Sequence, residues 1–234
     1  IHAAREAVVA SGRLGKVSQV QMSVAHGYHG VSLLRRLLGV RYEACRITAR
    51  GFVAPLVAGP GRDGPPTAES IEQAGQTLAW LDYGEKLGVF DFSGSQYFSW
   101  IRSPRVLVRG ERGEINGTTV RWLEDFRTPH TAELLRRDTG HDGNLEGQYH
   151  VGIELAGQWL YRNPFVPGRL ADDEIAVATC LAKMADYAAG GPSFYSVAEA
   201  AQDHYLGMMI DRAAATGEVI STEVQAWAKD GAGS

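Results

Sequence analysis

The chain has 234 residues, of which 44% are hydrophobic and 21% charged, and its formal net charge at pH 7 is −4. A chain of this length can bury a full hydrophobic core in a single domain. The acidic balance argues against nucleic acid or an anionic membrane as the main partner. No apolar run in the sequence approaches the roughly 18–20 residues that cross a bilayer.

The first predicted elements are a helix and a strand. Residues 3–11 predict a helix, and because the first residues already look like the middle of one, we expect the chain to begin partway through a longer protein. Residues 17–24 alternate with a period of two, which predicts a strand. The largely apolar face of this strand comprises Ser18, Val20, Met22 and Val24, and the other face comprises Val17, Gln19, Gln21 and Ser23.

A second helix follows this strand directly. Its apolar residues recur at helical spacing and stop at Gly39, a residue type that commonly ends helices. These apolar residues are Leu33, Leu34, Leu37 and Leu38. The junction between strand and helix carries His26, Tyr28 and His29. Polar side chains at such a junction are held by a rigid scaffold, so we expect them to contribute to a functional site.

The middle of the chain predicts further strands. Residues 45–53 alternate, with Cys45, Ile47 and Ala49 on one face. Residues 55–67 are rich in Pro and Gly and predict a loop. The other predicted strands are residues 76–83, 86–92, 105–109, 118–123, 148–155 and 158–161.

Two helices and a tail close the chain. Helical periodicity covers residues 172–188, and a capping-box pattern at residues 196–199 starts a helix that continues to about residue 215. Strands clustered between helices predict an α+β fold, an open, mostly antiparallel mixed sheet with helices packed on one face. The other face carries Arg46, Thr48 and Arg50, and it must be either solvated or paired with another subunit, which makes it available for oligomerisation.

Cys45 and Cys180 are the two cysteines of the chain, and each lies among apolar neighbours in the sequence. Buried free thiols of this kind are typical of a reducing compartment. We therefore expect both thiols to be buried and the protein to be cytoplasmic.

Several segments together resemble the C-terminal domain of the Gfo/Idh/MocA oxidoreductases, a family of sugar and inositol dehydrogenases. Residues 2–17 resemble the helix and Gly-x-Leu-Gly turn that lead out of the family's nucleotide domain. Residues 109–115 resemble its Gly-x-x-Gly turn before a strand. Residues 172–178 and 195–215 resemble its two closing helices.

The resemblance implies how the chain is divided and what it binds. Residues 1–16 are expected to connect to a preceding nucleotide domain, residues 17–228 to form the substrate and oligomerisation domain, and residues 229–234 to be a frayed tail. NAD or NADP is implied, bound mainly outside this chain, because the sequence has no Gly-x-Gly-x-x-Gly after a strand and no Glu-Lys-Pro motif. A sugar or polyol substrate and a homo-oligomer are implied as well.

The family's Asp-x-x-x-His motif falls on Ala25 and His29 in this chain. The resemblance implies that His29 is the acid/base group acting on the substrate hydroxyl, with His26 as a partial replacement for the absent aspartate. Histidine suits this role, because its ordinary pKa lies near neutrality. The alternative is a histidine that merely caps the helix.

The remaining candidates are substrate-binding side chains. Tyr28 belongs to the same junction, and Tyr97 and Arg102 lie in a seven-residue run of aromatic, hydroxyl and cationic groups that suits a sugar ring. Arg169 either anchors a substrate anion or pairs with Asp172 or Asp173. His141 and Asp142 lie in a polar loop that could approach a ligand.

Two other functions remain open at this point. The chain could be a non-catalytic ligand-binding or scaffold module, which the alanine at position 25 favours. It could also be a metal-dependent lyase or isomerase, because two histidines three residues apart can share one face of a helix. That second alternative uses His26 and His29 as ligands.

Overall fold

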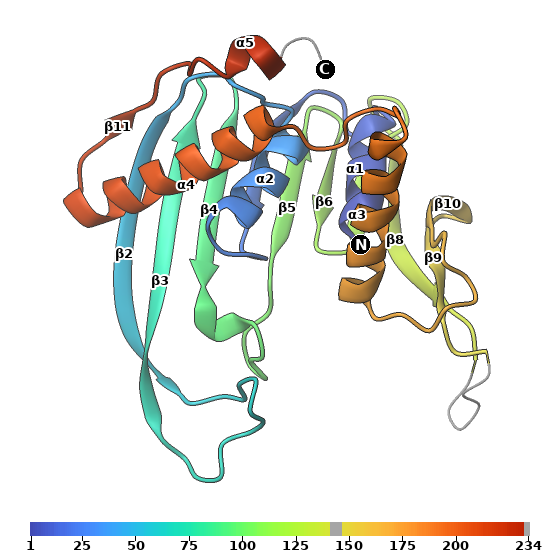
Figure 1. Cartoon of the computed structure of the whole chain (residues 1–234), viewed down its shortest axis with the longest axis horizontal. Helices are drawn as coiled ribbons and strands as arrows, with labels where there is room; N and C mark the ends of the chain where they lie inside the picture. Colours follow the sequence, from blue (N-terminus) through green and yellow to red (C-terminus); the bar gives the residue numbers. More distant parts are fainter. Residues whose placement is uncertain (141–146, 232–234) are drawn as a thin grey trace.

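One sheet of eleven strands runs through the part of the chain that the computed structural model describes, residues 1–140 and 147–231 (Figure 1). The strand order is β10-β9-β8-β7-β6-β5-β1-β4-β3-β2-β11, and the pair β1–β4 is parallel while the other neighbours are antiparallel. The strands are β1 (Val17–Met22), β2 (Arg46–Val57), β3 (Ile71–Asp82), β4 (Leu87–Ser93), β5 (Val106–Gly110), β6 (Gly113–Asn116), β7 (Thr119–Leu123), β8 (Pro129–Asp138), β9 (His150–Leu155), β10 (Gln158–Arg162) and β11 (Ile220–Ser221). This architecture confirms the predicted α+β class.

Two helices, α2 and α4, lie side by side on one face of the sheet (Figure 1). α2 packs on β1 and β4, and α4 crosses β2 and β3. The hydrophobic core lies between these helices and the strands, and it continues to Ala4 and Val8 of the first helix. The helices are α1 (His2–Ala10), α2 (Gly27–Leu38), α3 (Asp172–Ala188), α4 (Val197–Thr216) and α5 (Ala228–Gly231), with a 3-10 helix at Gly94–Gln96. None of the helices described is long and apolar enough to cross a membrane.

β1 shows the predicted alternation only from Val20 onward. Val20 and Met22 are buried, as expected, but Val17 is also buried and Ser18 is exposed, which reverses their predicted faces. The pairing of β1 with β5 shifts register between Val17 and Gln19. Such a bulge adds one residue to the strand, so the side chains before it point to the opposite face.

The hairpin of β2 and β3 is longer than the sequence predicts. Paired residues run from Arg46 and Asp82 to Val57 and Ile71, so β2 continues into the segment expected to be a loop. Pro55 is compatible with this extension. β2 pairs with β11 only at Arg46 and Ile47, so the rest of β2 is an edge strand. Proline is tolerated at an edge because its missing N–H is not needed for a hydrogen bond to a neighbouring strand. The predicted face of Cys45, Ile47 and Ala49 is confirmed as buried.

β8 was not predicted from the sequence. The strand spans Pro129–Asp138, and Leu134 is its one fully buried side chain. Most of its other positions are exposed and several are charged, so the alternation of apolar and polar residues that identifies a strand is absent. The segment is a strand because it pairs with β7 on one side and with β9 on the other.

The bounds of α3 are confirmed, but this helix is largely uncovered. Only Ile175 of the helix is buried, and Leu181 is 66% exposed. The prediction that Cys180 is buried is wrong for the same reason, whereas Cys45 is buried in the core as expected. Helical periodicity identifies a face but does not establish what covers it.

α2 approaches β4 closely at Gly30. A Cβ atom at this position would lie 2.5 Å from the Ala25 carbonyl oxygen and 2.7 Å from Phe90 Cε2. We therefore expect Gly30→Ala to destabilise the protein by about 1–3 kcal/mol in urea denaturation, because the helix must move away from the sheet. Gly207→Ala in α4 is the control: its Cβ would meet nothing closer than 3.5 Å, so an unchanged or slightly higher stability is expected. Equal stabilities for the two variants would contradict this account of α2 packing.

Candidate functional site

His26 is the residue immediately before α2, and its backbone is extended, with φ −78° and ψ 157°. Its Nδ1 lies 2.7 Å from the hydroxyl oxygen of Tyr97, and its backbone N–H donates to the same oxygen over 3.3 Å. A phenol that accepts from the backbone N–H can donate its own proton to Nδ1, which leaves the proton of neutral His26 on Nε2. The structure thus joins two predicted site residues that lie far apart in the sequence.

His29 lies one turn further along α2, and its ring contacts that of His26. Its ring centroid is 4.0 Å from that of Tyr28 and 5.2 Å from that of His26. All three side chains are exposed to solvent. Partial burial of the ring and, second, the nearby His26 lower the pKa of His29 below its ordinary value of 6.5. His29 is therefore neutral at physiological pH and able to accept a proton.

A cavity of about 280 Å³ opens beside His26 between α2, the sheet and α4. Its walls are His26, Gly27, Thr77, Phe90, Phe92, Gly207, Ile210 and Asp211. Asp211 supplies a carboxylate to this cavity, whereas position 25, where the resemblance expects one, is an alanine. No local pattern in the sequence marks Asp211 as a site residue.

One face of α4 carries the residues that approach this site. The rings of His204 and Tyr28 are 6.1 Å apart between centroids, and Gly207 and Asp211 line the cavity. These α4 residues are spaced three and four apart, which places them on one side of the helix. That spacing was visible in the sequence, but the position of α4 next to α2 was not.

The structure does not gather a metal site here. Among the residues it describes, no group of three or more His, Cys, Asp or Glu side chains is placed to hold a metal ion. His26 and His29 therefore have no third ligand within the described part of the chain. His141 and Asp142 lie outside the described residues.

The two predicted substrate-binding arginines lie apart from the histidines. The Nη1 atom of Arg102 donates to Ser95 Oγ over 3.2 Å, and its side chain lines a separate pocket. Arg169 is exposed just before α3, and no described contact joins it to His26 or His29. Among the predicted site residues, the structure therefore brings together His26, Tyr28, His29 and Tyr97.

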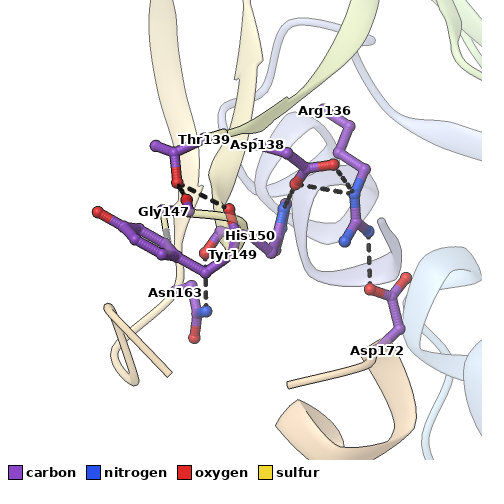
Figure 2. Close-up of polar contacts among 8 residues, drawn as sticks. All are labelled: Arg136, Asp138, Thr139, Gly147, Tyr149, His150, Asn163 and Asp172. Carbon is purple, nitrogen blue, oxygen red and sulfur yellow. Dashed lines mark hydrogen bonds and ion pairs between the residues drawn. The ribbon is translucent and has the colours of Figure 1, made fainter. Parts of the chain in front are cut away.

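Asp172, a predicted partner of Arg169, pairs with Arg136 instead (Figure 2). Arg136 Nη1 is 2.7 Å from Asp172 Oδ1, and Arg136 Nε is 2.8 Å from Asp138 Oδ2. Asp138 also accepts from buried His150, whose Nδ1 is 2.8 Å away. Burial raises the pKa of Asp138, but the hydrogen bonds from His150 and Arg136 outweigh burial and keep it below its ordinary value.

The polar chain in Figure 2 links three elements at the end of the sheet remote from α4. It joins β8, β9 and the first residue of α3, and the side chain of Asn163 reinforces it by donating to the His150 carbonyl over 2.8 Å. Because the acceptors among these hydrogen-bonded residues face donors within the protein, we interpret the network as structural: it fixes the position of the start of α3.

No protein-family model matches the sequence, and no curated protein matches it. Solved structures do match. Levoglucosan dehydrogenase, in complex with NADH and levoglucosan, superposes with a TM-score of 0.56 at 12% identity over 96% of this chain and 64% of its own. An oxidoreductase domain protein from Kribbella flavida gives a TM-score of 0.54 at 17% identity, covering 95% and 63% of the two chains.

A third match is an NAD binding oxidoreductase from Klebsiella pneumoniae, with a TM-score of 0.53 at 13% identity over 94% of this chain and 63% of that one. The present chain thus spans less than two thirds of the length of each of these proteins. At such identities the likeness concerns the fold. The chain has the fold found in the larger part of each of these oxidoreductases.

Proposed function

We propose that this chain is the substrate-binding and oligomerising part of an NAD(P)-dependent oxidoreductase of the Gfo/Idh/MocA type, acting on a sugar, cyclitol or related alcohol. The observation that carries the proposal is the cluster of His26, Tyr28, His29 and Tyr97 at the start of α2, beside a cavity. The fold shared with solved NAD-binding oxidoreductases supports it.

The side chains of this cluster fit the alcohol half of a dehydrogenase site. Neutral His29 accepts the proton of the substrate hydroxyl as the alcohol becomes a carbonyl, and it returns that proton in the reverse reaction. Tyr28 packs against the His29 ring and limits its orientation, and Tyr97 positions His26 through the 2.7 Å hydrogen bond. A nicotinamide cofactor bound beside this cluster would supply the acceptor for the hydride of the alcohol carbon.

The cofactor would be held mainly by a nucleotide domain that precedes residue 1. Residues 1–16 would then connect the two domains, and residues 17–228 would form the substrate domain. The exposed apolar side chains of α3 support a neighbouring domain that covers this helix, because an exposed apolar face is unfavourable in water. They are Val177, Leu181, Met184 and Tyr187.

The face of the sheet opposite α2 and α4 is the proposed self-association surface. Phe52 and Trp80 on this face are both partly exposed. Large aromatic side chains on an uncovered sheet are enriched at contacts between subunits. We propose a homo-oligomer that forms through this face.

Ala25 favours a second candidate function, a non-catalytic ligand-binding module. Because position 25 is an alanine, His29 has no carboxylate partner from the residue four positions before it. A retained cavity without acid/base chemistry would still bind a sugar or polyol.

Steady-state assays of the gene product that contains this chain distinguish the two functions. We expect reduction of NAD or NADP with at least one member of a panel of sugars, cyclitols and polyols, followed by the absorbance of the reduced nicotinamide. The matched control is the isolated chain of residues 1–234, for which we expect no turnover. Sugar binding by the gene product in calorimetry without any turnover across the panel would instead establish the binding module.

A further inference from the structure

A polar pocket of about 420 Å³ lies where β3 and β4 meet the segment that leads from β4 to β5. Its walls are Gln76, Ser93, Gln96, Ile101, Arg102, Ser103 and Arg105. In Figure 1 this segment lies at the lower end of the sheet, where the β4 arrow ends. The proposed catalytic site does not use this pocket, which opens on the face of the sheet proposed above for self-association, since Gln76 is paired with Phe52.

The pocket lies on the opposite face of the sheet from the histidine cluster. Gln76 and Ser93 are paired residues of β3 and β4 that line it, and their neighbours Thr77 and Phe92 line the His26 cavity. Because successive residues of a strand point to opposite faces, the two cavities are separated by the sheet. A ligand in the polar pocket is therefore distinct from one bound beside His26.

Gln96 gives the first indication that the pocket has a ligand. Its side chain is only 8% exposed, and its Nε2 is buried without a hydrogen-bond partner. A buried amide donor without an acceptor is costly, and such groups in folded proteins normally have a partner. Because Gln96 lines the pocket, an acceptor atom of a bound molecule can provide the missing hydrogen-bond partner of its Nε2.

The charges of the pocket give the second indication. Buried Asp91 is neutralised by Arg105, and it also accepts a hydrogen bond from Gln76. Arg102 bonds to Ser95 Oγ, and among the described residues no carboxylate lies within ion-pair distance of its guanidinium. The pocket therefore retains one positive charge and an excess of donors.

We propose that this pocket binds a small polyhydroxy anion, a sugar acid or a sugar phosphate. The guanidinium of Arg102 binds the oxyanion, which matches its paired N–H donors, and Gln96 Nε2 donates to an oxygen of the same ligand. The exposed hydroxyl of Ser103 is available to a hydroxyl of the ligand. A volume of about 420 Å³ leaves room for a sugar skeleton in addition to the anionic group.

Isothermal titration calorimetry on the full chain tests this site with four ligands at constant ionic strength: gluconate, glucose 6-phosphate, glucose and inorganic phosphate. We expect at least one of the two sugar anions to bind about tenfold or more tightly than glucose and than inorganic phosphate. Which anion binds identifies the carboxylate or the phosphate as the recognised group.

Two variants and one control assign the binding to the pocket. Arg102→Gln is expected to weaken the binding of the sugar anion by about tenfold or more, since it removes the uncompensated charge. Gln96→Leu is expected to weaken it as well, with circular dichroism used to check folding. Arg62→Gln, a loss of the same charge in an exposed loop, should leave the affinity unchanged.

Three results would overturn the proposal. They are the absence of binding by both sugar anions, affinity for glucose or for inorganic phosphate equal to that for the sugar anions, and unchanged affinity in folded Arg102→Gln.

Discussion

His29→Gln is expected to lower kcat/KM for NAD(P)-dependent alcohol oxidation by about 10²–10⁴-fold in the gene product that contains this chain. Glutamine keeps the size and polarity of the side chain but cannot take up the hydroxyl proton. The measurement is the initial rate of nicotinamide reduction with the best substrate of the panel. Turnover equal to that of the unmodified protein would refute the acid/base role of His29.

His26→Gln is the matched comparison for this prediction. His26 is already engaged at Nδ1 by Tyr97, so we expect a smaller loss of rate than for His29→Gln. The two variants also differ in their pH dependence. Oxidation needs neutral His29, so kcat/KM falls as the pH drops through the pKa of His29, which lies below 6.5. Since nearby His26 lowers that pKa, its removal should move this fall to a higher pH. An unshifted profile would contradict the coupling.

Asp203→Ala is expected to destabilise the protein by about 3–5 kcal/mol, measured by urea denaturation. Asp203 is 1% exposed and forms an ion pair with Arg35, which is 5% exposed. The pair joins α2 to α4, and Arg35 also donates to the Arg41 carbonyl. Removing the carboxylate leaves a buried guanidinium without its counter-charge, and the loss of that partner dominates the expected effect.

The control is Asp211→Ala, the same substitution two turns further along α4 at an exposed position. We expect its effect on stability to stay within about 0.5 kcal/mol. Similar stabilities for the Asp203 and Asp211 variants would show that the ion pair is not a main source of stability at the α2–α4 contact.

Asp203 has a second partner, because the Tyr195 hydroxyl donates to it over 2.9 Å. Burial first, and the charge of Asp203 second, raise the pKa of this hydroxyl.

The local elements of the site were predictable from the sequence. The leucine spacing and Gly39 predict α2, and Gly39 indeed has the left-handed backbone, with φ 67°, that ends this helix. His26 and His29 were placed at the start of α2 by the same reasoning. These features depend on neighbours within one or two turns, so the information lies in a short stretch of sequence.

Features that depend on pairing between distant segments were not predictable in this way. The bulge that reverses Val17 and Ser18 arises where β1 meets β5, and β8 is a strand because β7 and β9 flank it. The exposure of Cys180 follows from what covers α3, which periodicity does not report. Each of these outcomes depends on contacts between residues far apart in the chain.

The sequence by itself determined the α+β class, the α2 helix and the histidines at its start, because periodicity and end signals are local properties. The tertiary structure alone decided the partners of these groups: Tyr97 on His26, Asp211 in the cavity, and Arg136 rather than Arg169 on Asp172. Side-chain partners depend on the register and packing of whole elements, and a single sequence carries no local signal for either.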